Sequence, residues 1–369
     1  MKNKEPLIHL TKRSDITAGK AWIIRAVAIL ASLIFCGILT LAIARVNPIK
    51  LYTAMFQGSF GSKRRVWVLL SNMSALLGLS LAVTPAFKMR CWNLGAEGQC
   101  LAGALATTAC MILLGGKVSN PLLWVIMLVS AICAGAIWGF IPAFFKARYG
   151  TNETLFTLMM NYVATQLVAY YIVIWETTKG SANIGVINQR TEAGWLPVIG
   201  GQRYLLNVLV IAAMTVFMFI YLRYTKHGYE IDVVGESEKT ARYIGINVRT
   251  VIIRTMILSG AMCGICGWLL VGSTNHTLTT SLTSGYGFTA VMVSWLSRFD
   301  PLIMIFSSFL LIFMNKGASE VASSLSLNES YGDILTGIVL FFLIGCEFFI
   351  NYRIVFRKSG AKAAEKKEA

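Results

Sequence analysis

Charged residues are scarce in this chain. Asp, Glu, Lys and Arg make up 14% of the 369 residues, whereas a soluble domain carries about 25%. Hydrophobic residues make up 56% and the mean hydropathy is +0.65, which is more apolar surface than a water-soluble protein of this size can bury. A bilayer remains as the environment, because a helix of about 20 apolar residues crosses its core. The composition therefore predicts an all-α polytopic membrane protein.

Sequence signatures of catalysis are also missing. Gly116 and Lys117 are followed by Val118 and lack an upstream Gly, so they do not form the G-x-x-x-x-G-K-[ST] loop that binds ATP phosphates. There is no H-E-x-x-H, and no carboxylate pair stands at helical spacing in a plausible pocket. We therefore expect no catalytic residue, no metal site and no cofactor bound by this chain. Any energy source must come from elsewhere.

Neither a disulfide framework nor a nucleic-acid-binding motif is present. The net charge of +16 sits at the chain ends and between apolar runs. An excess of Lys and Arg in cytoplasmic loops explains this distribution better than a phosphate-binding face does. All eight Cys lie in or beside apolar stretches, and Cys263 and Cys266, spaced C-x-x-C, are interpreted as small packing residues. We expect no nucleic-acid partner.

Ten apolar segments are predicted to cross the membrane. They cover residues 21–44, 66–87, 93–114, 121–145, 155–174, 205–222, 251–272, 288–296, 301–314 and 334–350. The first is too long for the apolar core of a signal peptide, and no cleavage signal follows it. An even number of spans puts both chain ends on one side. That side is cytoplasmic, because about 23 of the 33 Lys and Arg then lie inside.

The predicted organisation follows from these spans. It consists of a cytoplasmic N-terminal segment at 1–20, a transmembrane domain at 21–351 and a basic cytoplasmic tail at 352–369. An arrangement of eight spans with re-entrant pieces is the alternative.

A long cytoplasmic loop at 223–250 carries the signals of a short helix. Ser237 can cap the N-terminus of a helix from Glu238 to Ile244, and Gly245 can end it in the left-handed conformation. A capped helix between spans either docks a partner or is an ordinary surface turn.

Two of the predicted spans are irregular. The third begins with the polar, Gly-rich stretch 93–99, and the eighth is very short and follows Ser-Gly-Tyr-Gly at 284–287. If the chain consists of two pseudo-repeated five-span halves, these are the third segments of each half. Interrupted segments at matching positions indicate a substrate path, because irregular backbone at membrane depth is tolerated only against protein or water.

Candidates for lining this path are Asn93, Glu97, Gln99, Asn161 and Phe288. A carboxylate at the bilayer centre costs about 2.5–3.5 kcal/mol. Glu97 therefore lines or braces the path with Asn93 and Gln99, or it caps a helix end and pairs with Lys88 or Arg90. The amide of Asn161 either bonds a neighbouring helix or contacts solute. Phe288 is the aromatic side chain expected beside the pore.

Four stretches of the chain resemble one family. Residues 85–99 resemble the signature A-F-x-x-x-x-F-N-I-G-x-E-G-Q of ABC importer permeases of the ribose, nucleoside and branched-chain amino acid type. Residues 150–162 are similar to the run G-x-N-E-V-I-x-T-L-M-L-N-Y-I of the nucleoside branch. Residues 235–246 resemble the coupling segment G-E-N-x-x-A-A-R-Y-A-G-I, and residues 285–288 resemble the element G-x-G-F. The four stretches stand in the same order as in that family.

Three departures from these patterns lie near the expected path. Trp92 stands in place of Phe, Thr289 stands where the family often has Asp, and Ser-Trp-Leu-Ser at 294–297 replaces a run of small residues. These changes leave the exact solute open.

The resemblance implies the ABC importer permease fold, in the longer of two paralogous types, in a bacterial cytoplasmic membrane. It implies ATPase subunits docked on the coupling loop, with coupling residues Gly235, Glu236, Ala241, Arg242 and Gly245. It also implies a second permease chain, either a shorter paralogue or another copy, and an extracytoplasmic solute-binding lipoprotein.

The implied function is translocation of nucleosides or a related small polar solute, with ATP used only by partner subunits. A permease for a sugar or a branched-chain amino acid is one alternative. A stand-alone secondary transporter is the other.

Overall fold

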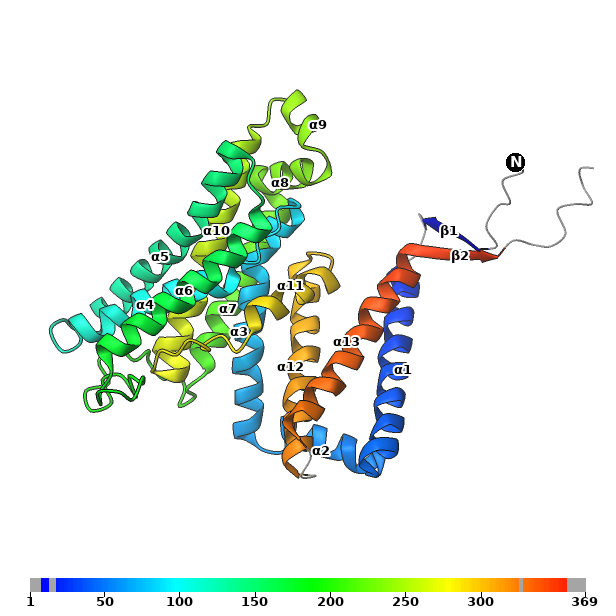
Figure 1. Ribbon diagram of the computed structural model, residues 1–369, viewed down its shortest axis with the longest axis horizontal. Helices are drawn as coiled ribbons and strands as arrows, with labels where there is room; N and C mark the ends of the chain where they lie inside the picture. The colour runs from blue at the N-terminus through cyan, green and yellow to red at the C-terminus, as the bar shows by residue number, and fades with distance from the viewer. Residues whose placement is uncertain (1–7, 13–17, 325–327, 357–369) are drawn as a thin grey trace, which may run out of the picture. The chain divides into compact units, whose positions relative to one another are not determined.

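The computed structural model describes residues 8–12, 18–324 and 328–356 (Figure 1). Large parts of the predicted N-terminal segment (1–20) and of the predicted tail (352–369) lie outside these residues. The chain divides into two compact units, one made of residues 1–59 and 314–369 and the other of residues 60–313. The elements are β1 (Ile8–Lys12), α1 (Ala18–Ala44), α2 (Pro48–Phe60), α3 (Lys63–Lys88), α4 (Ala96–Leu114), α5 (Asn120–Tyr149), α6 (Glu153–Trp175), α7 (Leu205–Tyr224), α8 (Lys226–Glu236), α9 (Glu238–Tyr243), α10 (Val248–Leu269), the π-helix η1 (Leu270–Asn275), α11 (Tyr286–Leu296), α12 (Pro301–Ser324), α13 (Glu329–Asn351) and β2 (Tyr352–Phe356).

Nine helices of the described residues are long and apolar enough to cross a membrane, namely α1, α3, α4, α5, α6, α7, α10 with η1, α12 and α13. Apart from the short strands β1 and β2, the described elements are helical. The prediction of an all-α polytopic membrane protein is confirmed.

The eighth predicted span differs from the others, because its helix is too short to cross a membrane alone. Residues 288–296 belong to α11, which has only 11 residues and is therefore about 16 Å long, half of a hydrocarbon core of about 30 Å. The coil at 276–285 precedes this short helix. Nine helices of the described residues are therefore long enough to span a membrane alone, and the coil with α11 forms an interrupted apolar segment.

Two further boundaries differ from the prediction. α12 continues to Ser324, well past the predicted end at 314. α2 was not predicted, because its 13 residues mix apolar and polar side chains and are too few to span. Leu51 and Met55 of α2 are buried, whereas Ile49 and Phe56 are exposed.

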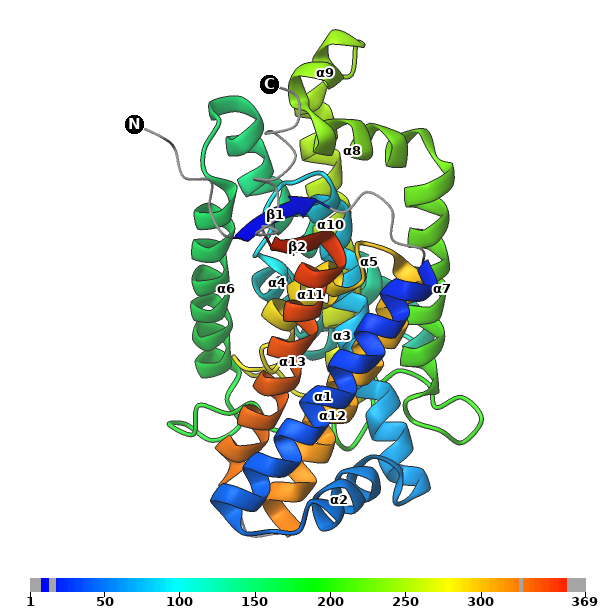
Figure 2. The ribbon, with the colours of Figure 1, turned by 90° about the vertical axis from the view of Figure 1, so that its right-hand side faces the viewer.

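In the first unit, α1 and α13 pack against each other around polar contacts. Arg25 and Glu347 form an ion pair of 2.6 Å, and the Tyr331 hydroxyl donates to Thr40 Oγ1 at 2.7 Å. β1 pairs antiparallel with β2, an arrangement that was not predicted. This pairing puts the start of α1 and the end of α13 at the same end of the unit (Figures 1 and 2).

The centre of the second unit is the contact between α5 and α10, two helices that both carry a G-x-x-x-G spacing. Gly135 and Gly139 of α5 face Gly260 and Gly264 of α10. A methyl group added at Gly260 would collide with the carbonyl oxygen of Gly135, and one at Gly264 with that of Ala131. Small residues of this kind let helix backbones approach closely inside a membrane.

The two ends of the second unit are capped differently. α8 and α9 lie at one end, and the long loop at 176–204 lies at the other (Figures 1 and 2). This loop covers the end of α10, where the Leu196 amide donates to the Gly272 oxygen at 2.9 Å and the Ile187 amide to the His276 oxygen at 2.8 Å. The His276 ring stacks on Trp195 with centroids 3.9 Å apart. The interrupted crossing therefore starts from a fixed point beneath the loop.

Candidate functional site

Both segments that were predicted to be irregular are interrupted in the structure. α3 ends with Arg90 in the left-handed conformation (φ 59°) and with the Cys91 amide donating to the Ala86 oxygen at 2.9 Å, the pattern of a Schellman motif. The chain then runs as coil to Gly95 before α4 begins. The second interruption is the coil at 276–285 that precedes α11.

The coil before α4 lies deep in the unit rather than at its surface. The Asn93 amide donates to Ser259 Oγ at 2.9 Å, and Ser259 is 11 positions into α10, about 16 Å along that helix. The side chain of Asn93 is fully buried and that of Gln99 is 1% exposed. Irregular backbone at this depth needs protein partners for its polar groups.

Asn93 and Gln99 supply some of these partners. Asn93 Oδ1 accepts from the Gly95 amide at 3.0 Å and from Gln99 Nε2 at 3.2 Å. The two side chains therefore hold the turn that leads into α4.

Asn161 of α6 bonds the same coil and the first turn of α4. Its Nδ2 donates to the Leu94 oxygen at 2.8 Å, and its Oδ1 accepts from the Gly98 amide at 2.9 Å. Thr157, one turn earlier, accepts from the Leu94 amide at 3.2 Å. The amide of Asn161 is thus used between helices, the first of the two alternatives that the sequence allowed.

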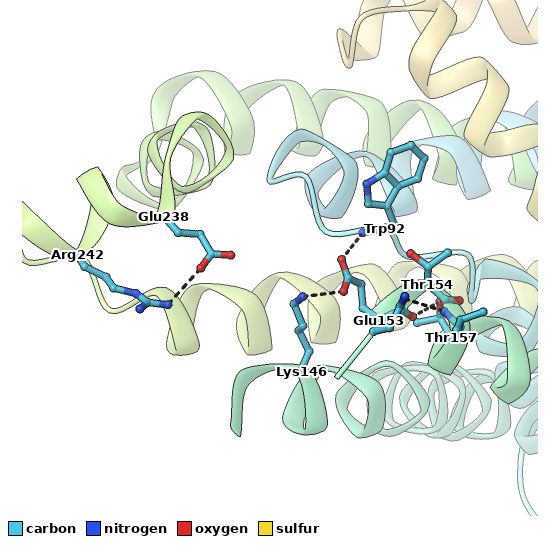
Figure 3. Close-up of polar contacts among 9 residues, drawn as sticks. Trp92, Lys146, Glu153, Thr154, Thr157, Glu238 and Arg242 are labelled. Atoms are coloured by element: carbon cyan, nitrogen blue, oxygen red, sulfur yellow. Dashed lines mark hydrogen bonds and ion pairs between the residues drawn. The ribbon is translucent and has the colours of Figure 1, made fainter. Parts of the chain in front are cut away.

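Glu153 anchors the outer part of the coil to α5 and α6 (Figure 3). Its carboxylate accepts from the Trp92 amide at 3.4 Å and pairs with Lys146 at 2.8 Å. Coil, α5 and α6 are therefore joined by one carboxylate at the α8 end of the unit.

Glu97 connects the two interrupted crossings. From the first turn of α4, its carboxylate accepts hydrogen bonds from the Thr283 hydroxyl and from the Gly287 amide, the latter at 3.1 Å. Gly287 is in the first turn of α11, where backbone N–H groups are unsatisfied and negative charge is favoured. Glu97 therefore caps the N-terminus of α11, although the two bonded residues are 190 positions apart in the sequence. The proposed partner Lys88 instead pairs with Asp232 at 2.7 Å.

α11 presents one exposed face. Phe288, Met292 and Trp295 are 46%, 45% and 49% exposed and follow each other at helical spacing. On the opposite face, Ser294 Oγ donates to the Ser80 oxygen of α3 at 3.0 Å. The structure thus places Phe288 on the exposed face of the short helix whose start Glu97 holds.

The short helix predicted in the loop at 223–250 forms, and it ends at Tyr243, one residue before the predicted end. α9 runs from Glu238 to Tyr243, and the Ser237 side chain accepts from the Thr240 amide at 3.2 Å. Gly245 follows with φ 88°, and the Ile246 amide donates to the Ala241 oxygen at 2.9 Å. The predicted caps are confirmed.

The five predicted coupling residues divide into buried and exposed positions. Ala241 is the fully buried residue of α9, and Gly235 is buried in α8. Glu236, Arg242 and Gly245 are exposed, and Arg242 bonds Glu238 at 3.2 Å (Figure 3). Tyr243, 92% exposed, forms the tip.

α8 is joined directly to the end of α3. Gly235 lies so close to Lys88 that a methyl group on it would collide with the Lys88 oxygen. The Lys88–Asp232 ion pair holds the same contact, and on the other side Glu230 pairs with Arg254 of α10 at 2.9 Å. Burial raises the pKa of Glu230, but the hydrogen bond and charge of Arg254 outweigh it and leave that pKa below its usual value.

Sequence reasoning did not find Ser259, Thr283 or Asp232. Each contacts a site residue that is more than 100 positions away in the chain, so no local pattern marks it. In the described part of the chain, no group of three or more His, Cys, Asp and Glu is placed to hold a metal ion. The polar side chains of the site hold the backbone of the coil before α4 and of the start of α11 in place.

Comparison with known proteins gives the same picture. The family model for the permease component of branched-chain amino acid transport systems matches residues 66–344. The glucose ABC transporter permease protein TsgB13 of Haloferax volcanii is 28% identical over 94% of this chain and 93% of its own length. The guanosine ABC transporter permease protein NupP of Bacillus subtilis is 26% identical over 83% and 88%. The nucleoside ABC transporter permease protein NupB of Lactococcus lactis subsp. cremoris is 26% identical over 92% and 94%.

The family model covers about three quarters of the sequence, in the same region as the interrupted crossings and the α8–α9 segment. Permease components are transport subunits rather than enzymes. The chain belongs to the family of branched-chain amino acid transport system permease components, and it is a multi-pass permease subunit of an ABC importer.

Proposed function

We propose that this permease carries nucleosides across a bacterial cytoplasmic membrane, on a path that runs past the two interrupted crossings. The observation that carries this proposal is the bridge from Glu97 to Thr283 and Gly287. It joins the first turn of α4 to the coil and the first turn of α11, and irregular backbone at membrane depth is expected only against protein or water.

The path residues act in two ways in this proposal. Asn93, Gln99 and Asn161 are buried and hold the coil, while Glu97 holds the start of α11. Phe288, on the exposed face of α11, meets the solute. Among the relatives, NupP and NupB are named for guanosine and nucleosides, which supports the nucleoside class.

Energy comes from separate ATPase subunits in this proposal. α8 and α9 offer an exposed tip with Arg242 and Tyr243, and α8 contacts the end of α3 at Lys88. A push on the tip is therefore transmitted to the coil before α4. Gly235, Glu236, Ala241, Arg242 and Gly245 form this coupling segment.

Two further parts complete the proposed assembly: a second permease chain, which is a shorter paralogue or another copy, and an extracytoplasmic binding lipoprotein that delivers the solute. Both chain ends are cytoplasmic. The β1–β2 pair supports placing both ends on one side of the membrane, because it holds the start of α1 and the end of α13 together. A C-terminal fluorescent protein fusion should fluoresce, and alkaline phosphatase inserted in 176–204 should be active.

Substrate competition tests the proposal. Cells without their own nucleoside uptake would express the whole system, and uptake of labelled guanosine would be measured with excess uridine, glucose or leucine. Uridine should compete, whereas glucose and leucine should not. Guanosine uptake that is absent, or that is unchanged when the ATPase subunits are deleted, would contradict the proposal.

A sugar is the second candidate solute. The similarity to the glucose permease protein TsgB13, over 94% of this chain, favours it. In the same experiment, a sugar permease would take up labelled glucose and ignore excess uridine.

A further inference from the structure

A cavity of about 500 Å³ lies at the α8 end of the second unit. It opens between the end of α3, the end of α11 and α8. Aromatic rings line one part of it (Phe87, Trp92, Trp295 and Phe299), and charged side chains line the other (Lys88, Arg90, Asp232 and Glu236). It is separate from the buried amides that hold the coil before α4.

The two tryptophan rings lie against each other and remain open to the cavity. Their centroids are 5.5 Å apart with an angle of 31° between the planes. Trp92 is 44% and Trp295 49% exposed. Phe87 packs edge-on against Trp92 at 5.8 Å, and Phe299 does the same to Trp295 at 5.6 Å. The outer rings therefore fix the orientation of the two indoles.

Both tryptophans are departures from the family patterns that the chain resembles. Trp92 stands in place of Phe, and Trp295 belongs to the stretch that replaces small residues. The positions are about 200 residues apart in the sequence, yet the rings are in contact. The two departures thus form one feature in space, a broad aromatic surface where the family pattern would leave a smaller one.

Polar groups surround this surface. The Lys88–Asp232 ion pair of 2.7 Å stands beside it, with side chains 27% and 45% exposed. Arg90 and Glu236 are exposed at its edge. Aromatic side chains bind nucleobases by stacking, whichever base is present, because every base has a flat π-face. The charged side chains can form hydrogen bonds with ribose hydroxyls and with the edges of the base.

We propose that this cavity is an inner-face binding site for nucleosides, in which the base stacks on Trp92 and Trp295 as the solute leaves the path. The proposal rests on the nucleoside function proposed above and adds a second solute position to it. The site is joined to the coupling segment, because Gly235 and Asp232 of α8 contact Lys88, the residue after Phe87. A movement of α8 therefore changes the shape of the site.

Equilibrium binding tests the site. The assembled complex with its ATPase subunits, in nanodiscs and without the binding protein, would be titrated with labelled guanosine. Trp295→Leu should raise Kd about tenfold, the size expected for losing one stacking partner. Trp295→Phe keeps a flat ring and should restore most of the affinity. Trp175→Leu is the control, because Trp175 ends α6 at the end of the unit opposite to the cavity. It should leave Kd unchanged.

Several results would overturn the site. These are no guanosine binding to the unaltered complex, an unchanged Kd in Trp295→Leu, or glucose displacing guanosine as well as unlabelled guanosine does. An unchanged Kd would reduce the tryptophans to membrane-interface anchors. Uptake by the same complex in proteoliposomes, with the binding protein outside and ATP inside, separates the two proposals. Guanosine uptake with an unchanged Kd in Trp295→Leu removes only the inner site, whereas glucose uptake without guanosine uptake removes the proposed substrate as well.

Discussion

At the scale of single residues, this permease uses polar side chains to hold backbone. Asn93, Asn161 and Glu97 all bond main-chain groups of the interrupted crossings. Each bond satisfies a group that water would otherwise have to reach at membrane depth. In the structure, these three predicted path residues hold the backbone around the start of α4 and of α11.

Glu97→Gln should weaken the junction between α4 and α11. The amide keeps one acceptor but loses the negative charge that the start of α11 favours, so we expect a loss of about 1–3 kcal/mol in stability. The thermal unfolding temperature of the purified complex and the rate of guanosine uptake should both fall. Glu192→Gln, in the exposed part of the long loop at 176–204, is the matched control. Equal behaviour of the two variants would show that Glu97 is not a bridge.

Gly245→Val should uncouple ATP hydrolysis from uptake. The residue has φ 88° and open space around it, so the substitution strains only the backbone, where a β-branched side chain disfavours the left-handed conformation. ATPase activity should persist while uptake falls. Gly245→Asn, which tolerates this conformation, should transport near the normal rate. Uptake by Gly245→Val at the level of the unaltered protein would remove the coupling role of α9.

At the scale of elements, close helix packing and loop closure shape the second unit. Gly260→Leu should separate α5 from α10, because even a methyl group there collides with the Gly135 oxygen. A loss of several kcal/mol, about 3 or more, is expected from such overpacking. The yield of folded complex after detergent extraction would measure it. Gly337→Leu, where no atom lies within 4 Å, should extract normally, and similar yields would contradict the packing argument.

The long loop at 176–204 should open in acid. Burial, together with the charge of Arg203, lowers the pKa of His276 to about 4. Because the usual pKa is about 6.5, the opened state takes up a proton between these values and the closed state does not. The closed loop therefore loses stability as pH falls from about 6.5 to about 4, by at most about 3 kcal/mol. Hydrogen exchange of residues 184–196 would follow the opening.

His276→Phe gives the matched comparison for this pH effect. It keeps a ring to stack on Trp195 but cannot take up a proton, so exchange of the loop should lose its dependence on pH in this range. His227→Phe, on α8 at the opposite end of the unit, should keep the dependence. A pH response that survives in His276→Phe would assign it to another group.

The elements also show which structure was predictable. Hydropathy predicted the long spans, and Ser237 and Gly245 predicted the caps of α9. These features were predictable because each depends on residues close together in the sequence. The Glu97–Thr283 contact joins residues 186 positions apart, and the α8–α3 contact joins Gly235 to Lys88. Such contacts depend on the packing of whole helices, so sequence patterns indicated the irregular segments without showing that they meet.

At the scale of the whole molecule, the account describes a passive conduit. Nine helices of the described residues are long and apolar enough to cross a membrane, and we propose that α8 with α9 receives the force from the ATPase subunits. The two compact units do not follow the predicted division into two five-span halves, and that internal repeat stays a prediction.

Reconstituted transport tests this central claim most directly. Proteoliposomes would contain the chain with its second permease and ATPase subunits, with the binding protein and labelled guanosine outside and ATP inside. The account predicts accumulation that needs ATP and stops when the ATPase subunits are left out. Accumulation by this chain alone, driven by an ion gradient without ATP, would contradict it.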